Sequence, residues 1–265
     1  MRKLRSGKLV AAFAVLLVVS FAVMNAMPSD TLPAALLQET VLALVAFAAV
    51  GFAIPDALKR CTQTVQQRSI VRFTAITLLL VGLVGGAITL LAWLFAGGGT
   101  MAGFASTALP STADLMENLL ILLGICLLTG LYEESFMRVL GIEAFERALD
   151  TKRAILASAA LFALLHVGAP DVSVSQLVLL QAALKFGQAL LFGVILGGLY
   201  VRTRRLWPCA FIHAGFDVLY MAPNVLLTGT MPETYASGAV GDTVLLAVSV
   251  LMLSGIVLKI RKEIA

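Results

Sequence analysis

Residues 115–138 read LMENLLILLGICLLTGLYEESFMR, an apolar run that ends in two adjacent glutamates and an arginine. Apolar runs of about 17 to 25 residues match the hydrocarbon core of a bilayer. Lipid offers no hydrogen-bond partners, so the backbone of such a run has to pair its own polar groups in a helix. We therefore expect residues 115–131 to span a membrane, with charged side chains close to one end of the span.

The rest of the chain repeats this apolar pattern. Among its 265 residues, 60% are hydrophobic and 13% are charged, whereas a soluble domain averages about 25% charged residues. We predict an all-α fold: a single membrane domain over residues 1–265, built as a polytopic bundle of about eight transmembrane helices. The expected spans are residues 9–27, 36–54, 73–96, 115–131, 154–167, 177–201, 206–221 and 243–260.

The basic residues predict how the bundle is oriented. All but one of the 19 Lys and Arg residues lie in five segments, residues 2–8, 59–72, 138–153, 202–205 and 259–262. The alternate loops contain none: residues 28–35, 97–114, 168–176 and 222–242. Loops rich in Lys and Arg stay in the cytoplasm, so we predict a multi-pass protein of the cell membrane with both termini in the cytoplasm. This pattern also accounts for the net charge of +4, so we expect the lipid bilayer as a partner and no nucleic acid.

The acidic pair Glu133 and Glu134 precedes Arg138. Residues four apart share one face of a helix, so Glu134 can pair with Arg138. Neighbouring residues point about 100° apart, so the two glutamates are not expected to share one role. One can face a cavity while Arg138 holds the other. The alternative is a solvated helix end, where such pairs are usually found.

The chain has two histidines, and both lie in or beside apolar runs. Phe162 shares a helix face with His166, and His213 shares one with Asp217, since each pair is four residues apart. Ionisable groups inside a span cost about 2.5–3.5 kcal/mol each, which makes them functional candidates. Each also fits a packing role when taken alone. Together with the carboxylates, the histidines suit two chemistries: binding a divalent metal, or activating a water between Glu and His.

Three ordered motifs resemble those of the CAAX protease and bacteriocin-processing family. They are Glu133-Glu134-x-x-x-Arg138, Phe162-x-x-x-His166 and His213-x-x-x-Asp217. The stretch from Phe192-Gly193-x-x-x-Gly197 through Leu206-Trp207-Pro208 to His213 is also similar to the family. The family includes eukaryotic prenyl-protein endopeptidases and bacterial proteins similar to lysostaphin resistance protein A. The resemblance covers about residues 115–220, the motif-bearing core, and leaves the first three spans and the last without a signature.

The resemblance implies a hydrolase, an intramembrane endopeptidase whose cavity opens to the cytoplasm and whose substrate is a peptide or a membrane-protein segment. The implied catalytic residues are Glu133, Glu134, Arg138, His166, His213 and Asp217. In the implied mechanism Glu133, helped by His166, deprotonates a water that attacks a peptide carbonyl, and His213 and Asp217 lie near the oxyanion. The resemblance fixes no cofactor, and a divalent metal held by Glu133, His166 and His213 is the open alternative.

Asp217 departs from the family's pattern, in which Asn is common at this position. An Asn amide can donate a hydrogen bond to an oxyanion, whereas an ionised Asp only accepts. Two roles for Asp217 are therefore open: a protonated donor, or an ionised partner of His213.

Two other functions compete with proteolysis. One is a transporter with a proton relay through Glu39, Lys185 and the motif residues, although the inverted repeats and broken helices of such proteins are not evident here. The other is a non-catalytic bacteriocin-immunity or partner-binding protein on the same fold. Lys185 forms a polar stripe with Gln181 and Gln188. We expect this stripe to face the bundle interior, toward either Glu39 or a substrate.

The motifs can meet only if the helices extend beyond the apolar runs. If the helix at 115–131 ended at the membrane surface, Glu133 would lie there, and His166 would lie about 20 Å higher at 1.5 Å per residue. We therefore expect one of two arrangements. Either this helix continues past Arg138, which the apolar spacing from Phe136 to Leu149 allows, or the helix at 154–167 starts lower or tilts strongly.

Overall fold

Every element in the described part of the chain is a helix. The computed structural model describes residues 2–62, 68–96, 110–167, 173, 175–231 and 237–264, and no strand occurs in these ranges. The elements are α1 (Arg2–Ala26), α2 (Leu32–Ala53), α3 (Pro55–Thr62), α4 (Arg68–Ala96), α6 (Thr112–Glu134), the π-helix η1 (Ser135–Ile142), α7 (Glu143–Phe145), α8 (Thr151–His166), α9 (Leu177–Thr203), α10 (Leu206–Thr228) and α11 (Val240–Ile264). The predicted all-α bundle is confirmed.

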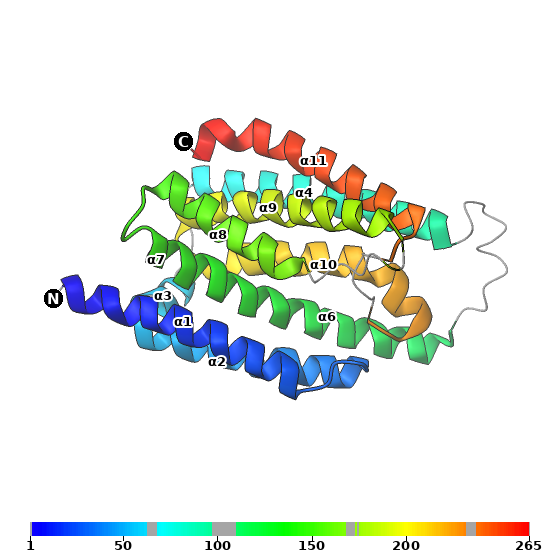
Figure 1. Cartoon of the computed structure of the whole chain (residues 1–265), viewed down its shortest axis with the longest axis horizontal. Coiled ribbons are helices and arrows are strands. Elements are labelled where there is room, and N and C mark those ends of the chain that lie inside the picture. The colour runs from blue at the N-terminus through cyan, green and yellow to red at the C-terminus, as the bar shows by residue number, and fades with distance from the viewer. Residues whose placement is uncertain are drawn as a thin grey trace.

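The long helices lie side by side along one axis (Figure 1). α10 packs between α6 and α4, α9 packs between α8 and α11, and α2 joins α1 to α6. The start of α1 and the end of α11 lie at the same end of the bundle, together with α3 and α7 (Figure 1). These elements lie within or overlap the basic segments of the sequence, so the alternation read from the sequence corresponds to the two ends of the bundle.

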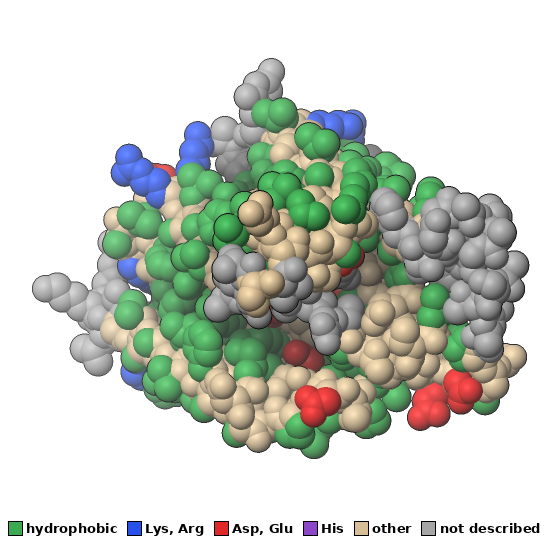
Figure 2. All heavy atoms as spheres, turned by 45° about the vertical axis from the view of Figure 1, so that its right-hand side comes forward, with side chains coloured by type: hydrophobic (Ala, Val, Ile, Leu, Met, Phe, Trp, Pro, Cys, Tyr) green, Lys and Arg blue, Asp and Glu red, His purple; other side chains and the backbone are tan. Residues whose placement is uncertain are grey.

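The opposite end differs in its surface. Figure 2 turns this end partly forward and shows a mostly apolar or uncharged surface, with acidic side chains exposed along its lower side and basic ones at the left and upper edges of the view. The surface is hollowed between the helices, and acidic side chains are visible inside the hollow (Figure 2).

Seven helical stretches in the described residues are long and apolar enough to cross a membrane, and α8 is not among them. Its 16 residues reach about 24 Å, short of the ~30 Å hydrocarbon core. α8 nevertheless begins at the end that holds the termini and ends partway along the bundle, whereas α9 begins at the far end (Figure 1). Seven of the eight predicted spans therefore meet these criteria, and the one predicted at residues 154–167 does not.

The helix that carries the two glutamates continues well beyond the apolar run. α6, η1 and α7 form one apolar helical stretch of 34 residues, Thr112–Phe145. The stretch begins at a capping box, in which Ser111 and Asp114 satisfy each other's backbone N–H groups. The prediction that this helix continues past Arg138 is confirmed. Glu133 and Glu134 consequently lie in the interior of a long helix.

Small residues let the site-bearing helices approach one another closely. A Cβ added to Gly130 would lie 2.6 Å from the carbonyl oxygen of Ala210, across the α6–α10 contact. On α9, a Cβ added to Gly193 would lie 2.9 Å from the Cβ of Ala159 on α8. Since a real Cβ does not approach other atoms so closely, only glycine allows these backbone separations.

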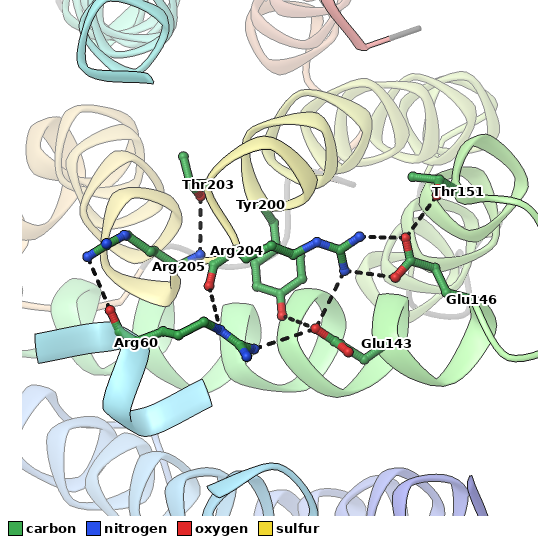
Figure 3. Close-up of polar contacts among 8 residues, drawn as sticks. All are labelled: Arg60, Glu143, Glu146, Thr151, Tyr200, Thr203, Arg204 and Arg205. Carbon is green, nitrogen blue, oxygen red and sulfur yellow. Dashed lines mark hydrogen bonds and ion pairs between the residues drawn. The ribbon is translucent and has the colours of Figure 1, made fainter. Parts of the chain in front are cut away.

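An ion-pair network joins the elements at the end that holds the termini (Figure 3). Arg204, between α9 and α10, donates from Nη1 and Nη2 to Glu146 at 2.7 and 2.8 Å. Its Nη1 lies 3.5 Å from Glu143 Oε1, which also accepts from the Tyr200 hydroxyl at 3.0 Å. Arg60 of α3 donates from Nε to the Arg204 carbonyl at 3.2 Å. The network ties α7 to the turn that starts α10.

Candidate active site

Glu134, Arg138 and His213 form a buried charged cluster between α6, η1 and α10. Their exposed fractions are 0%, 1% and 3%. His213 Nδ1 lies 2.8 Å from Glu134 Oε1, and Arg138 Nε lies 3.0 Å from Glu134 Oε2. A carboxylate only accepts hydrogen bonds, so His213 Nδ1 carries a proton and Glu134 fixes the orientation of the ring.

Arg138 connects this cluster to α8. The centre of its guanidinium lies 4.5 Å from the centre of the Phe162 ring, a cation–π contact. Its contact with Glu134 is an ion pair rather than an aligned hydrogen bond, and Nη1 and Nη2 have no hydrogen-bond acceptor among the described residues. The buried guanidinium therefore depends on the Glu134 charge.

Glu133 points about 100° further around the helix, toward a cavity. Its Oε2 lies 3.4 Å from His213 Nε2 and 3.7 Å from His166 Nε2. Its side chain is 20% exposed and that of His166 is 27% exposed, so both can be reached from the cavity. The structure thus separates the two glutamates: Arg138 holds Glu134, and Glu133 faces open space.

The ring of His166 is fixed by α8 itself. Nδ1 lies 2.9 Å from the carbonyl oxygen of Phe162, one turn earlier, and the two rings lie 4.1 Å apart. A carbonyl only accepts, so Nδ1 carries a proton. Nε2 faces Glu133 Oε2 at 3.7 Å.

Asp217 completes the group and faces His213 from the Nε2 side of the ring, opposite Glu134. Its Oδ2 lies 3.4 Å from His213 Nε2, so Nε2 lies equally far from Glu133 and Asp217. The edge of the His213 ring packs against Phe192 of α9, with the ring centres 5.1 Å apart. All six residues named from the sequence motifs are brought together in one place.

A cavity of about 320 Å³ opens beside Glu133 and His166. Apart from these two residues its walls are mainly apolar. They are contributed by α1 (Leu17, Ser20, Phe21, Met24, Asn25), by α6 and η1 (Tyr132, Phe136, Met137) and by α8 (Phe162, Leu165). Sequence reasoning missed the α1 wall, because apolar residues on a first helix carry no signal beyond their own hydropathy.

Polar side chains of α2 and α9 also lie inside the bundle. Glu39 of α2 is hydrogen-bonded to Thr129, and its charge interacts with Glu133 and Asp217. Gln181 and Gln188 of α9 are buried, at 0% and 2% exposed, which confirms that the polar stripe faces the interior.

The metal alternative requires at least three ligands placed around one ion. In the described part of the chain, no three His, Cys, Asp or Glu side chains meet this requirement.

The fold and this cluster define a multi-pass helical membrane protein with a glutamate and histidine centre beside a cavity. Residues 115–219 match the model of the Rce1-like family, described as type II CAAX prenyl endopeptidase Rce1-like. The match confirms, over this segment, the resemblance drawn from the three motifs. A comparison of the chain with curated proteins gave no match.

Proposed function

We propose that the protein is an intramembrane endopeptidase in which Glu133 is the general base. The observation that carries the proposal is the position of the Glu133 carboxylate, at the edge of the cavity and between the Nε2 atoms of His166 and His213. The match to a protease family over the residues that build this position supports the same reading.

In the proposed reaction a water lies between Glu133 and His166, and donates one hydrogen bond to each. Glu133 takes a proton from the water while the water oxygen bonds to the carbonyl carbon of the substrate. The carbonyl oxygen becomes an oxyanion, which the Nε2–H of His213 stabilises. The C–N bond then breaks as Glu133 returns the proton to the leaving nitrogen, which yields a new carboxyl group and a new amine. A positioned acid or base of this kind contributes about 10²–10⁴ in rate.

Glu134 and Arg138 act through His213 and do not touch the substrate. Glu134 accepts from Nδ1, which turns Nε2 toward Glu133 and Asp217. Arg138 balances the Glu134 charge. Both are positioning residues in this mechanism.

The cavity walls indicate the class of substrate. Phe21, Met24 and Leu165 are apolar, and each is more than a third exposed, so the cavity opens along an apolar surface. We propose a peptide or membrane-protein segment whose apolar part lies against α1 and α8, with the scissile carbonyl next to Glu133.

The test is cleavage by the purified chain in lipid nanodiscs. A fluorescence-quenched farnesylated CAAX-type peptide and its unlipidated counterpart serve as probes, together with proteomics of peptides released in cells. Glu133→Gln should lower cleavage by about 10²–10⁴, because Gln keeps the shape but accepts no proton. The matched control is Glu117→Gln, an exposed position on the same helix, which should cleave like wild type. Full cleavage by Glu133→Gln would remove this residue from the mechanism.

A further inference from the structure

Lys185 lies within α9, and it is the one Lys or Arg that falls outside the five basic segments of the sequence. Its Nζ donates to Gln188 Oε1 at 3.1 Å and lies 5.2 Å from the centre of the Tyr220 ring on α10. Gln188 in turn donates from Nε2 to the Ser249 hydroxyl of α11 at 2.8 Å. The ammonium is therefore held by contacts from α9 and α10, and α11 anchors its hydrogen-bond partner.

This position places the ammonium beside the candidate site. Tyr220 follows Asp217 by three residues, so both side chains lie on the same face of α10. The charge of Lys185 acts on Asp217 and Glu133. Lys185 thus approaches the site from α9, while Glu133 and Glu134 approach it from α6, Glu39 from α2 and His166 from α8.

Three carboxylates face the ring of His213. Nδ1 of His213 faces the Glu134 carboxylate, and Nε2 faces those of Glu133 and Asp217. Because carboxylates only accept hydrogen bonds, this surrounding suits a ring with a proton on both nitrogens. The ring and Arg138 offset two of the three carboxylates that face His213, and Lys185 is a further cation whose charge acts on this group, as the charge of Glu39 does.

We propose that Lys185 is a positioning residue that keeps Asp217 ionised and directed at His213 Nε2. In this arrangement Asp217 is an acceptor that holds the His213 ring, and it does not donate to the oxyanion. The catalytic meaning of the arrangement rests on the function proposed above, because His213 is the group that meets the oxyanion.

The two histidines of the chain allow a direct test that needs no substrate. In a His166→Gln background, His213 is the only histidine, so histidine labelled with ¹⁵N in the ring reports His213 alone, provided that the affinity tag contains no histidine. Lys185→Met should shift the His213 Nε2 signal, because Asp217 loses the charge that keeps it an acceptor. Lys185→Arg should restore the wild-type signal. In an Asp217→Asn background, Lys185→Met should leave the His213 signal unchanged.

Cleavage of the farnesylated probe, measured with His166 intact, gives the second readout. Lys185→Met should lower kcat by about 10- to 100-fold, the range of coupling between residues in contact, with KM within about twofold. The same change should cost less than about threefold in the Asp217→Asn background. Lys185→Gln, which keeps a polar group near Gln188, replaces Lys185→Met if the latter does not fold.

The inference is overturned if Lys185→Met shifts the His213 signal equally with Asp217 and with Asn at position 217, or shifts it in neither. A purely structural lysine would lower thermal stability by the same amount in both backgrounds without a change at His213. Failure of the proposed function is a separate result: Glu133→Gln would still cleave, whatever Lys185 does to the His213 signal.

Discussion

Glu133 and Glu134 are neighbours in the chain, but their surroundings differ because a helix turns about 100° between them. Glu134 is enclosed with Arg138 and His213, and Glu133 faces the cavity. The sequence indicated this division, since only Glu134 is four residues from Arg138. It did not indicate that Glu134 would also hold His213, because that contact joins residues 79 positions apart.

The enclosed glutamate is expected to matter most for stability. Glu134→Gln leaves the Arg138 guanidinium buried without its counter-charge, and removing one member of a buried ion pair costs about 3–5 kcal/mol. Glu133 is 20% exposed, and His213 keeps Glu134 and Asp217 beside it when Glu133 is changed, so Glu133→Gln should cost less stability than Glu134→Gln. Thermal unfolding in detergent, with Glu117→Gln as the control, compares the two. Equal midpoints for the Glu133 and Glu134 variants would show that the buried pair does not support the fold.

At the scale of elements, the contact between α6 and α10 sets the distance between Glu134 and His213. Gly130→Ala would place a methyl group 2.6 Å from the Ala210 carbonyl oxygen, so the two helices must separate. A misplacement of about 1 Å can cost about 10²-fold in rate, and we expect a loss of cleavage of that order. Gly215→Ala on α10 is the control, because a Cβ there meets nothing within 4 Å. Unchanged cleavage by Gly130→Ala would mean that the helices can yield without disturbing the site.

The ion pair between Glu146 and Arg204, which lies in the turn between α9 and α10, should make the stability of the fold depend on pH. Burial alone would raise the pKa of Glu146, but the hydrogen bonds and charge of Arg204 outweigh it and hold the pKa below its ordinary value of 4.5. A carboxyl whose pKa is lowered on folding stabilises the fold above its unfolded pKa, and this stabilisation is lost as pH falls through the folded pKa. The thermal stability of wild type should therefore fall more steeply below pH 4.5 than that of Glu146→Gln, as thermal unfolding at a series of pH values would measure. Parallel pH curves would remove this ion pair from the stability of the turn.

The π-helix η1 is the element that the sequence did not predict. The apolar spacing from Phe136 onward allowed a continued helix, but it contains no local signal for the wider π turn. π-helical turns are often found at functional sites, and η1 begins directly after Glu134 and contains Arg138. Its formation depends on packing against α1, α2 and α8, which no single segment encodes.

For the whole molecule, the helices and the ends at which they connect follow from apolar length and from the placement of Lys and Arg. These signals are local and additive, so they can be read from the sequence without knowing how the helices pack. The candidate site was predictable as far as its motif residues, because each is chemically out of place in a span. The α1 wall and the contacts of Lys185 with Gln188 and Tyr220 were not, because they depend on which helices become neighbours.

At the scale of the whole molecule, we predict which end of the bundle faces the cytoplasm. The positive-inside rule places the basic end of the bundle in the cytoplasm. A reporter fused after Arg205 should read as cytoplasmic, and one fused after Thr228 should read as extracytoplasmic, since α10 (Leu206–Thr228) separates them. Alkaline phosphatase and green fluorescent protein fusions measure the two states. The same side for both fusion points would contradict a crossing by α10.

The α1 wall of the cavity has an evolutionary consequence. The residues that would cut a substrate lie within residues 115–219, whereas α1 lies outside that segment. Selection can therefore alter Phe21 or Met24 without touching Glu133 or the histidines. Duplicated copies of such a gene could diverge in what they accept while keeping one inherited chemistry, and a chimera that exchanges only this first helix would carry the preference of its donor.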